Sequence, residues 1–278
     1  MIGHYFSLNG KLLPVSEAKV SVDSVEFVYG YGVYETLKVR NGVLYFPELH
    51  AERLLSSAKV IGIEVSYSAE EIIAFIRTLA ASVGQDSFNV KMLLMGKEKG
   101  SDLYVMALNP YYVTEKEYRD GVKVVTYSGE RQFVEAKTLN MLMSYLAYKK
   151  AKEEGAYDAL LVDREGFVCE GTRTNLFFTD GKKLFTPPLT DVLNGVTRIT
   201  LFDALQVKGI VVEERRLPLR ELGKYKGYFL TSTSSKVLPV SRIDGKMFEI
   251  PPIVKDVMRI YEEYLEGYVK KQKVAVKV

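Results

Sequence analysis

The sequence of 278 residues contains one cysteine, Cys169, and two histidines, His4 and His50. A single cysteine excludes an internal disulfide. Two histidines are too few for a histidine-rich metal site, and they do not supply a catalytic triad. We therefore expect no metal centre, and we interpret His50 as structural.

The chain also lacks a dominant charge and a long hydrophobic run. Its formal net charge is +3, with 26% charged and 47% hydrophobic residues, which is typical of a soluble globular protein. Such a balance does not favour nucleic acid or an anionic membrane as partner. Even AEEIIAFIRTLAASVG is interrupted by charge, so no run approaches the ~20 residues that span a bilayer. Because the N-terminal MIGHYFSLNGK lacks the pattern of a secretory signal, we expect a cytoplasmic protein.

Turn dipeptides and helical patterns predict an α+β fold. Asn-Gly or Asp-Gly pairs that predict hairpins and strand connections stand at 9–10, 41–42, 120–121, 180–181 and 244–245. Apolar residues at three-and-four spacing predict helices over 47–62, 68–84, 136–155, 194–209 and 251–272. The proline and charges of ALNPYYVTEKE predict a linker at 110–116 between a domain at 1–109 and a second at 117–278.

The stretch GYGVYE at 30–35 raises the question of a nucleotide site. A dinucleotide fingerprint needs a third glycine where Glu35 stands, and a phosphate loop needs a Gly-Lys-Ser/Thr ending that is absent. The glycines therefore predict a tight turn, followed by a strand in which one face carries Tyr34, Thr36 and Lys38. From this stretch alone, Tyr34 is a half-buried tyrosine of a hairpin.

Two basic residues have apolar surroundings. Arg53 lies beside the apolar side of the helix predicted at 47–62, so it requires an anion, either a phosphate or a neighbouring glutamate. Lys137 stands in AKTLNML, away from the solvated lysines that follow. Loss of hydration favours its neutral amine, which can attack an aldehyde to form a Schiff base. A lysine that extends to solvent at a helix start is the other interpretation.

Two chain reversals and one isolated acid complete the candidates. Asn194-Gly195 opens a predicted helix whose first amides have no partner within the helix and could bind an anion. The TSTSS run at 231–235 offers further amides and hydroxyls to an anion. Both segments can equally be ordinary loops without a ligand. Glu170, in FVCEGTRTN, would stabilise the protonated form of a basic nitrogen heterocycle. Pyridoxal phosphate requires a lysine, a carboxylate, phosphate donors and groups that orient the substrate. The sequence has candidates for all four.

Taken together, the motifs resemble those of the class IV, fold-type IV pyridoxal-phosphate enzymes. They are FVYGYGVYETLKVRNGVLYFPELHAERLLSSA, AKTLNMLMSYLAYKKA, EGTRTNLFF, LNGVTR and TSTSSKVLPV, in the family's order over most of the chain. The resemblance implies Lys137 as the catalytic lysine that bonds the cofactor, and Glu170 at its pyridine nitrogen. At the cofactor's phosphate it implies Arg53, Val196, Thr197, Thr233 and Ser234. For the substrate the candidates are Tyr34, Tyr31 and Lys97.

The resemblance also implies the fold and the reaction. The family has a small N-terminal α/β domain and a larger C-terminal pseudo-barrel α/β domain, and its members are typically homodimers. The implied activity is that of an aminotransferase, which moves the amino group between an aliphatic amino acid (a branched-chain L- or D-amino acid) and a 2-oxo acid such as 2-oxoglutarate. Its partners would be these small molecules, with no nucleic acid and no membrane.

Departures from the family patterns leave the substrate open. Tyr31 stands where many members have aspartate, and Leu142 stands where branched-chain enzymes have tyrosine. The stretch KTLNML is closer to the D-amino-acid and lyase branches, yet Lys97 and Lys99 are the only basic candidates for the carboxylate site of a D-specific enzyme. The aromatic residues near 31–34 favour aliphatic or aromatic substrates over acidic ones. Two alternatives stay open: aminodeoxychorismate lyase, and a non-catalytic module that binds a phosphate-bearing ligand.

Overall fold

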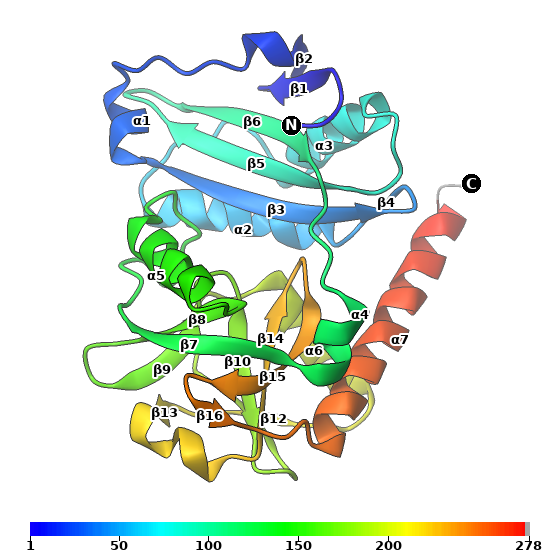
Figure 1. The fold of residues 1–278 in the computed structure, drawn as a ribbon. Coiled ribbons are helices and arrows are strands. Elements are labelled where there is room, and N and C mark those ends of the chain that lie inside the picture. The colour runs from blue at the N-terminus through cyan, green and yellow to red at the C-terminus, as the bar shows by residue number, and fades with distance from the viewer. Residues whose placement is uncertain (276–278) are drawn as a thin grey trace. The chain divides into compact units, whose positions relative to one another are not determined.

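The computed structural model in Figure 1 describes residues 1–275, which fold as two compact units. The first unit comprises Met1–Tyr111 together with Glu135–Met141, and the second comprises Tyr112–Val134 and the described residues from Leu142 onward. The boundary after Tyr111 falls within the linker expected at 110–116. The return of Glu135–Met141 to the first unit was not expected, and it arises because this segment pairs with a strand there.

The first unit is a six-stranded sheet with helices against one face (Figure 1). The strand order is β2-β1-β6-β5-β3-β4, with β1 Tyr5–Leu8, β2 Lys11–Pro14, β3 Gly32–Arg40, β4 Val43–Leu44, β5 Phe88–Gly96 and β6 Ser101–Leu108. The helices are η1 Val15–Glu17, α1 Val25–Tyr29, α2 Pro47–Val60 and α3 Ala69–Ser82. The apolar core lies between the sheet and helices α2 and α3.

Local sequence signals account for these elements. Asn9-Gly10 and Asn41-Gly42 have positive φ at both residues and connect directly paired strand ends, as two-residue hairpin turns require. Helix α2 begins with Pro47, and α3 begins after a reciprocal cap between Ser68 and Glu71. The helices predicted over 47–62 and 68–84 are confirmed.

The second unit contains a ten-stranded mixed sheet and five helical segments. Its strands are β7 Val122–Ser128, β8 Asp158–Val162, β9 Phe167–Gly171, β10 Asn175–Thr179, β11 Leu184–Thr186, β12 Val212–Glu214, β13 Leu217–Pro218, β14 Gly227–Ser232, β15 Lys236–Ile243 and β16 Lys246–Met247. The helices are α4 Glu115–Asp120, α5 Leu142–Glu153, α6 Val196–Val207, η2 Leu219–Lys224 and α7 Pro252–Ala275.

The order of the strands closes part of this sheet on itself. The path runs β12-β11-β10-β14-β15-β7-β8-β9-β13, and β9 also pairs with β10. The closing pair is Glu170 with Asn175. This closing pair places the candidate acid beside Asn175, which lies five residues later at the start of the next strand in the chain.

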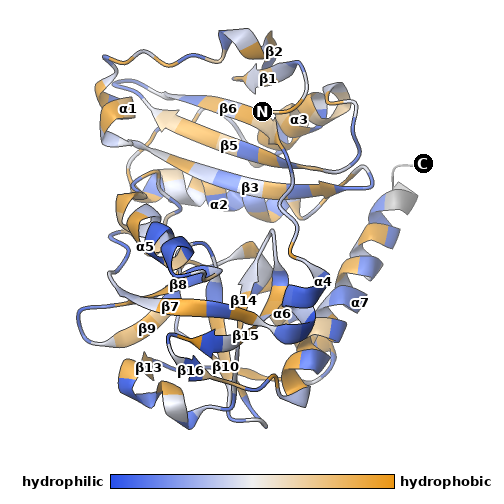
Figure 2. Ribbon diagram, viewed as in Figure 1, coloured by the Kyte–Doolittle hydropathy of each residue, from blue (hydrophilic) through white to orange (hydrophobic). Residues whose placement is uncertain are grey.

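The predicted helices of the second unit agree with the structure except at one start. The helices expected over 194–209 and 251–272 are α6 and α7. Helix α7 alternates hydrophilic and hydrophobic residues along its length and packs its apolar side on α6 and β15 (Figure 2). The helix expected over 136–155 begins only at Leu142, so Lys137 lies outside it. The segment AKTLNM is instead an irregular part of the first unit, with one isolated bridge from Thr138 to Val33.

Candidate active-site residues

The backbone of Lys137 is held between β3 and α2. The amide of Tyr34 donates to the Lys137 carbonyl (2.9 Å), and the Leu139 amide donates to the Gly32 carbonyl (2.8 Å). On its other side the Lys137 amide donates to Ser57 Oγ of α2 (3.0 Å). A Cβ at Gly32 would lie 2.7 Å from the Leu94 carbonyl and 2.8 Å from the Leu139 side chain, so this approach requires glycine.

The side chain of Lys137 extends over the ring of Tyr34. Its Nζ lies 4.5 Å from the ring centroid, and Lys137 is half-buried. Lys91, on the adjacent strand β5, places its Nζ 5.6 Å from the same ring. Two amines therefore lie beside the Tyr34 ring, that of Lys137 and that of Lys91 on β5.

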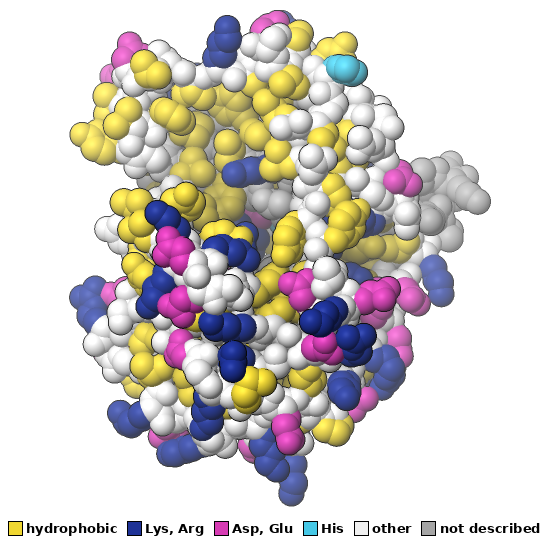
Figure 3. All heavy atoms as spheres, viewed as in Figure 1, with side chains coloured by type: hydrophobic (Ala, Val, Ile, Leu, Met, Phe, Trp, Pro, Cys, Tyr) yellow, Lys and Arg dark blue, Asp and Glu magenta, His cyan; other side chains and the backbone are white. Residues whose placement is uncertain are grey.

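The sheet face that carries Tyr34 is turned away from α2 and α3. Tyr34, Leu93 and Tyr104 align across β3, β5 and β6, and apolar residues next to them along each strand, among them Val33, Leu94 and Leu103, belong to the buried core. Figure 3 shows hydrophobic side chains gathered over these strands. This face is an apolar surface with Lys91 as a cation on it.

A buried ionic cluster lies on the other face of β3. Glu35 is fully buried, and its carboxylate accepts from Arg53 Nε (2.5 Å), Arg53 Nη2 (2.9 Å) and His50 Nδ1 (2.7 Å). Burial would raise the pKa of Glu35, but Arg53 and His50 outweigh it and hold that pKa well below its usual range. Burial lowers the pKa of His50 against the opposing effect of Glu35, so its imidazole is neutral at pH 7. Of the two anions considered for Arg53, a glutamate is present.

In the second unit, Glu170 is oriented by three donors. It is 5% exposed on β9 and accepts from Arg131 Nη1, Asn175 Nδ2 and the Leu193 amide, each at 3.2 Å. Asn175 is in turn fixed by a bond from Nδ2 to the Leu193 carbonyl (2.8 Å). These charge-assisted bonds hold a carboxylate in one orientation.

The turn that follows Glu170 is fixed by a buried acid. Asp158 accepts from the hydroxyls of Thr172 and Thr174 and from the Thr172 amide. A Cβ at Gly171 would collide with both Thr174 and Asp158. The EGTRTN motif is therefore a rigid turn that connects Glu170 to Asn175.

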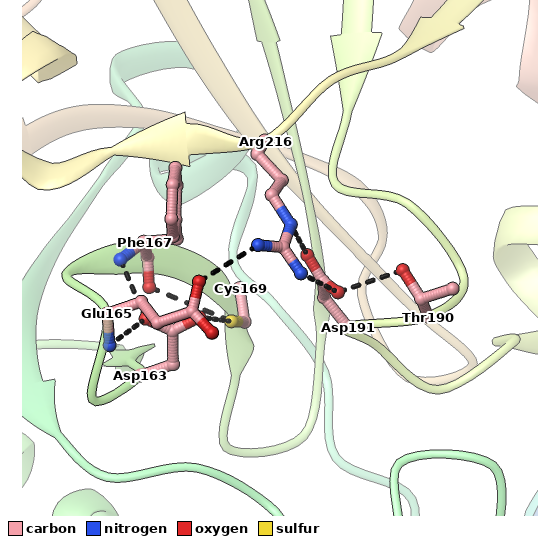
Figure 4. A network of polar contacts seen from close by, with 7 residues as sticks. All are labelled: Asp163, Glu165, Phe167, Cys169, Thr190, Asp191 and Arg216. Atoms are coloured by element: carbon pink, nitrogen blue, oxygen red, sulfur yellow. Dashed lines mark hydrogen bonds and ion pairs between the residues drawn. The ribbon is translucent and has the colours of Figure 1, made fainter.

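Behind this turn, Arg216 connects the β8–β9 hairpin to the loop before α6 (Figure 4). Its guanidinium pairs with Asp191 (2.9 Å) and Glu165 (3.1 Å) and lies 5.0 Å from the Phe167 ring. Asp191 precedes Leu193, whose amide reaches Glu170. Cys169 faces this network, as its thiol contacts Asp163, and burial raises its pKa to about 12, so it is not a nucleophile at pH 7.

The candidate phosphate-binding site has two parts in the second unit. Helix α6 begins after Gly195, which has no side-chain cap, so the first amides at Val196 and Thr197 lack a partner of that kind. Thr233 and Ser234 form the half-buried turn between β14 and β15. That turn is closed by Ser232 Oγ and Ser235 Oγ, which are 2.7 Å apart.

Two residues suggested for the substrate contact the chain itself. Tyr31 donates from its hydroxyl to the Gly62 carbonyl (3.1 Å), and its ring lies against Gly96. Lys97 is half-exposed and pairs with Asp102 (2.5 Å). Neither belongs to the row of Tyr34, Leu93 and Tyr104, so Lys91 is the cation that this row favours.

Several residues of these clusters were not singled out from the sequence as site residues. They are Glu35, Ser57, Lys91, Arg131, Asp158 and Asn175. Glu35 and Asn175 stand inside recognised motifs, whereas Lys91 and Arg131 have no local signal. Among residues 1–275 no cluster of three potential metal ligands occurs, and none of the helices there combines the length and the apolar character that a membrane span requires.

Comparison with known proteins identifies the family. The sequence model of the class IV amino-transferases matches residues 32–243. D-alanine aminotransferase of Bacillus licheniformis is 32% identical over 249 residues, which cover 86% of this chain and 88% of that protein.

Solved structures agree in fold. The branched-chain aminotransferase of Thermoproteus uzoniensis with norvaline has a TM-score of 0.85 at 30% identity, covering 94% of this chain and 93% of that one. The branched-chain amino acid aminotransferase of Escherichia coli has a TM-score of 0.86 at 25% identity, covering 92% of this chain and 93% of that one. The expected fold-type IV architecture is thereby confirmed, and the chain belongs to the class IV aminotransferase family.

Proposed function

We propose that the protein uses pyridoxal 5'-phosphate to move the amino group between an aliphatic amino acid and a 2-oxo acid such as 2-oxoglutarate. The observation that carries the proposal is Lys137, whose backbone amide and carbonyl are both hydrogen-bonded while its amine lies over Tyr34. A lysine that served only solubility would not require this support. The relatives named for D-alanine and branched-chain amino acids support the reaction class.

The residues present suit the chemistry of this cofactor. Glu170 offers an oriented carboxylate for a protonated pyridine nitrogen. The amides of Val196 and Thr197, with the turn of Thr233 and Ser234, offer donors to a phosphate. Arg53 completes the proposed set of phosphate ligands, with Glu35 fixing the direction of its guanidinium.

The residues of the chain then have distinct roles. When bound, pyridoxal phosphate supplies an electron sink for the electrons left at the substrate's α-carbon. Glu170 keeps the positive charge on the ring nitrogen. Lys137 Nζ takes the proton from the α-carbon as a general base, and the neighbouring Tyr34 ring confines the amine.

The sheet face of Tyr34, Leu93 and Tyr104 is proposed as the substrate wall. Its apolar surface suits an aliphatic side chain, and Lys91 suits a carboxylate. A surface that is apolar and also carries a cation would accept a branched-chain amino acid in one half-reaction and a dicarboxylate such as 2-oxoglutarate in the other. We assign Lys91 this role ahead of Lys97, and we assign Tyr31 to the support of the turn.

We further propose a homodimer in the cytoplasm. Apolar residues of the 20–29 segment are strongly exposed, among them Val22, Val28 and Tyr29, and a second copy of this chain would cover them. One free, buried cysteine suits a reducing compartment. Light scattering of the purified protein should give twice the mass of 31.4 kDa; a monomer would contradict the dimer.

The decisive experiment is a panel of L- and D-amino acids with 2-oxoglutarate or pyruvate, followed by chiral analysis of the products. We expect a yellow protein whose colour is bleached by borohydride, and amino transfer that is fastest with an aliphatic donor. Lyase activity on aminodeoxychorismate without transfer would contradict the reaction proposed. A folded, colourless protein that does not respond to pyridoxal phosphate would contradict the cofactor itself and favour a binding module.

A further inference from the structure

One face of the closed sheet in the second unit is covered by α6. Phe177 of β10 and Phe229 of β14 are aligned, and their rings stack with centroids 4.9 Å apart. Phe202 of α6 contacts Phe177, with a centroid distance of 6.2 Å. The aromatic pair thus marks the side of the sheet on which α6 packs.

A polar row continues this face beyond the aromatic pair. Because side chains alternate along a strand, Asn175 shares the face of Phe177, and Thr231 shares the face of Phe229. Asn175 is aligned with Thr231 on one side and with Glu170 on the other. Gly195, which precedes the first turn of α6, lies directly against Asn175 Oδ1. The row of Glu170, Asn175 and Thr231 therefore lies at the N-terminal end of α6.

The hydroxyl of Thr231 lacks a partner in this row. Thr231 is 1% exposed, and its Oγ1 makes no hydrogen bond within the described part of the chain. Its neighbour Asn175 directs its amide group to Glu170 and to the Leu193 carbonyl. A buried hydroxyl without a partner costs stability, and valine would fill the same space in a strand without that cost. A bound group that accepts a hydrogen bond from this hydroxyl would remove that cost.

The described part of the chain has two other buried side-chain atoms without a hydrogen-bond partner, but neither indicates a ligand site. Ser7 Oγ lies on β1 of the first unit, and Arg198 Nε belongs to a guanidinium that already pairs with Glu214 through Nη2 (2.6 Å). Thr231 differs because it stands in line with Glu170 and beside the uncapped start of α6.

We propose that the Thr231 hydroxyl donates a hydrogen bond to the phosphate of the bound cofactor. Thr231 would be a third part of the phosphate-binding site, beside the first amides of α6 and the turn of Thr233 and Ser234. That turn begins two residues after Thr231 in the chain. This inference rests on the proposed function, and it selects Thr231 from the hydroxyls of the 231–235 run because its Oγ1 is buried without a partner.

The test compares Thr231→Val with Thr231→Ser, which keeps the hydroxyl. Dissociation constants for pyridoxal 5'-phosphate and for pyridoxal, which lacks the phosphate, are measured by equilibrium dialysis on cofactor-free protein. We expect Thr231→Val to weaken binding of the phosphorylated form by about 10- to 100-fold, as loss of a hydrogen bond to a charged group would, and to leave pyridoxal unchanged. Thr231→Ser should bind both as the wild type does.

Thermal unfolding supplies a second readout. Without cofactor, Thr231→Val should unfold at the wild-type temperature or above it, because it removes a buried hydroxyl that has no partner. Thr231→Ala provides the same loss of the hydroxyl if the valine variant does not fold.

Three outcomes separate the hypotheses. Wild-type affinity of Thr231→Val for the phosphorylated cofactor would overturn the inference, and so would an equal loss for both ligands, since the phosphate would then not be the partner. Folded wild-type protein that binds neither ligand would instead overturn the proposed function, and this inference with it.

Discussion

The guanidinium of Arg53 donates twice to the carboxylate of Glu35, from Nε at 2.5 Å and from Nη2 at 2.9 Å. Glu35 is fully buried on β3, and the Arg53 side chain on α2 is 13% exposed. The pair therefore joins the strand that carries Tyr34 to the helix whose Ser57 supports Lys137. It also fixes the plane of the guanidinium.

Replacing Glu35 by Gln should destabilise the protein. The change leaves the Arg53 charge at a mostly buried position without its counter-ion, which typically costs about 3–5 kcal/mol. Urea unfolding at pH 7 would measure the loss, with Glu52→Gln on the exposed side of α2 as the control. A loss equal to that of the control would show that the ion pair contributes no net stability.

The same pair predicts how stability changes in acid. The folded-state pKa of Glu35 is lowered, so the unfolded chain takes up a proton near pH 4.5 that the folded chain does not. Its contribution is thus present above about pH 4.5 and is lost as the pH falls from there toward the folded pKa. His50, whose pKa is also lowered, adds a loss that begins below pH 6.5. The fall in unfolding free energy below pH 4.5 should be shallower in Glu35→Gln than in the wild type.

The local parts of the fold could be predicted from the sequence, and the long-range pairings could not. The Asn-Gly hairpins and four of the five helices follow from turn chemistry and apolar spacing. The segment before α5 has apolar residues at helical spacing, yet it pairs with β3, which lies about a hundred residues earlier. The residue pattern of a short segment does not show which distant strand that segment will pair with.

The same limit applies to the candidate site. Glu170 stood out as an isolated acid, and Asn175 lies only five residues away, but its other two donors, Arg131 and the Leu193 amide, are distant in the sequence. Lys91 appears in the sequence as one lysine of a strand, and only the alignment of β5 with β3 places it beside Tyr34. Distances in space between sequence-distant residues decided these assignments.

Lys91 and Lys97 make a matched pair for substrate recognition. Replacing Lys91 by Met removes the cation beside Tyr34 and should raise KM for 2-oxoglutarate by about 10-fold or more, as loss of a charge-assisted hydrogen bond would. KM for pyruvate, which has no second carboxylate, should change less. Lys97→Met should affect neither, because Lys97 is half-exposed and paired with Asp102. The reverse pattern in steady-state kinetics would move the carboxylate site to Lys97.

Replacing Lys137 by Ala should abolish covalent attachment of the cofactor. Borohydride treatment followed by mass spectrometry of the intact protein should show an added pyridoxyl group in the wild type and none in the variant. Turnover should fall by at least about 10²- to 10⁴-fold, the usual contribution of a general base. Ser57→Ala removes only the support of the Lys137 amide, so it should keep the adduct and lose much less activity. An adduct that persists in Lys137→Ala would place the reactive lysine elsewhere.

The bridge from Arg216 to Asp191 should contribute to cofactor binding through Leu193. Replacing Arg216 by Met keeps a long apolar stem near Phe167 but releases Asp191 and Glu165, so the loop that carries the Leu193 amide loses its support from the β9 side. Arg216 is 45% exposed and solvent screens its ion pairs, so we expect only a small loss in unfolding free energy. The dissociation constant for pyridoxal phosphate should rise by a few-fold, because Glu170 loses a fixed donor.

A double-mutant cycle with Asp191→Asn isolates this effect. If the bridge acts as described, the two single changes and the double change should weaken cofactor binding by similar amounts, because each one breaks the same contact. The exposed pair of Arg259 and Glu263 on α7 gives the control cycle, which should leave cofactor binding unchanged. Additive losses at Arg216 and Asp191 would mean that the two residues act on the loop independently, and the connection from Arg216 to Glu170 through the Leu193 amide would then be wrong.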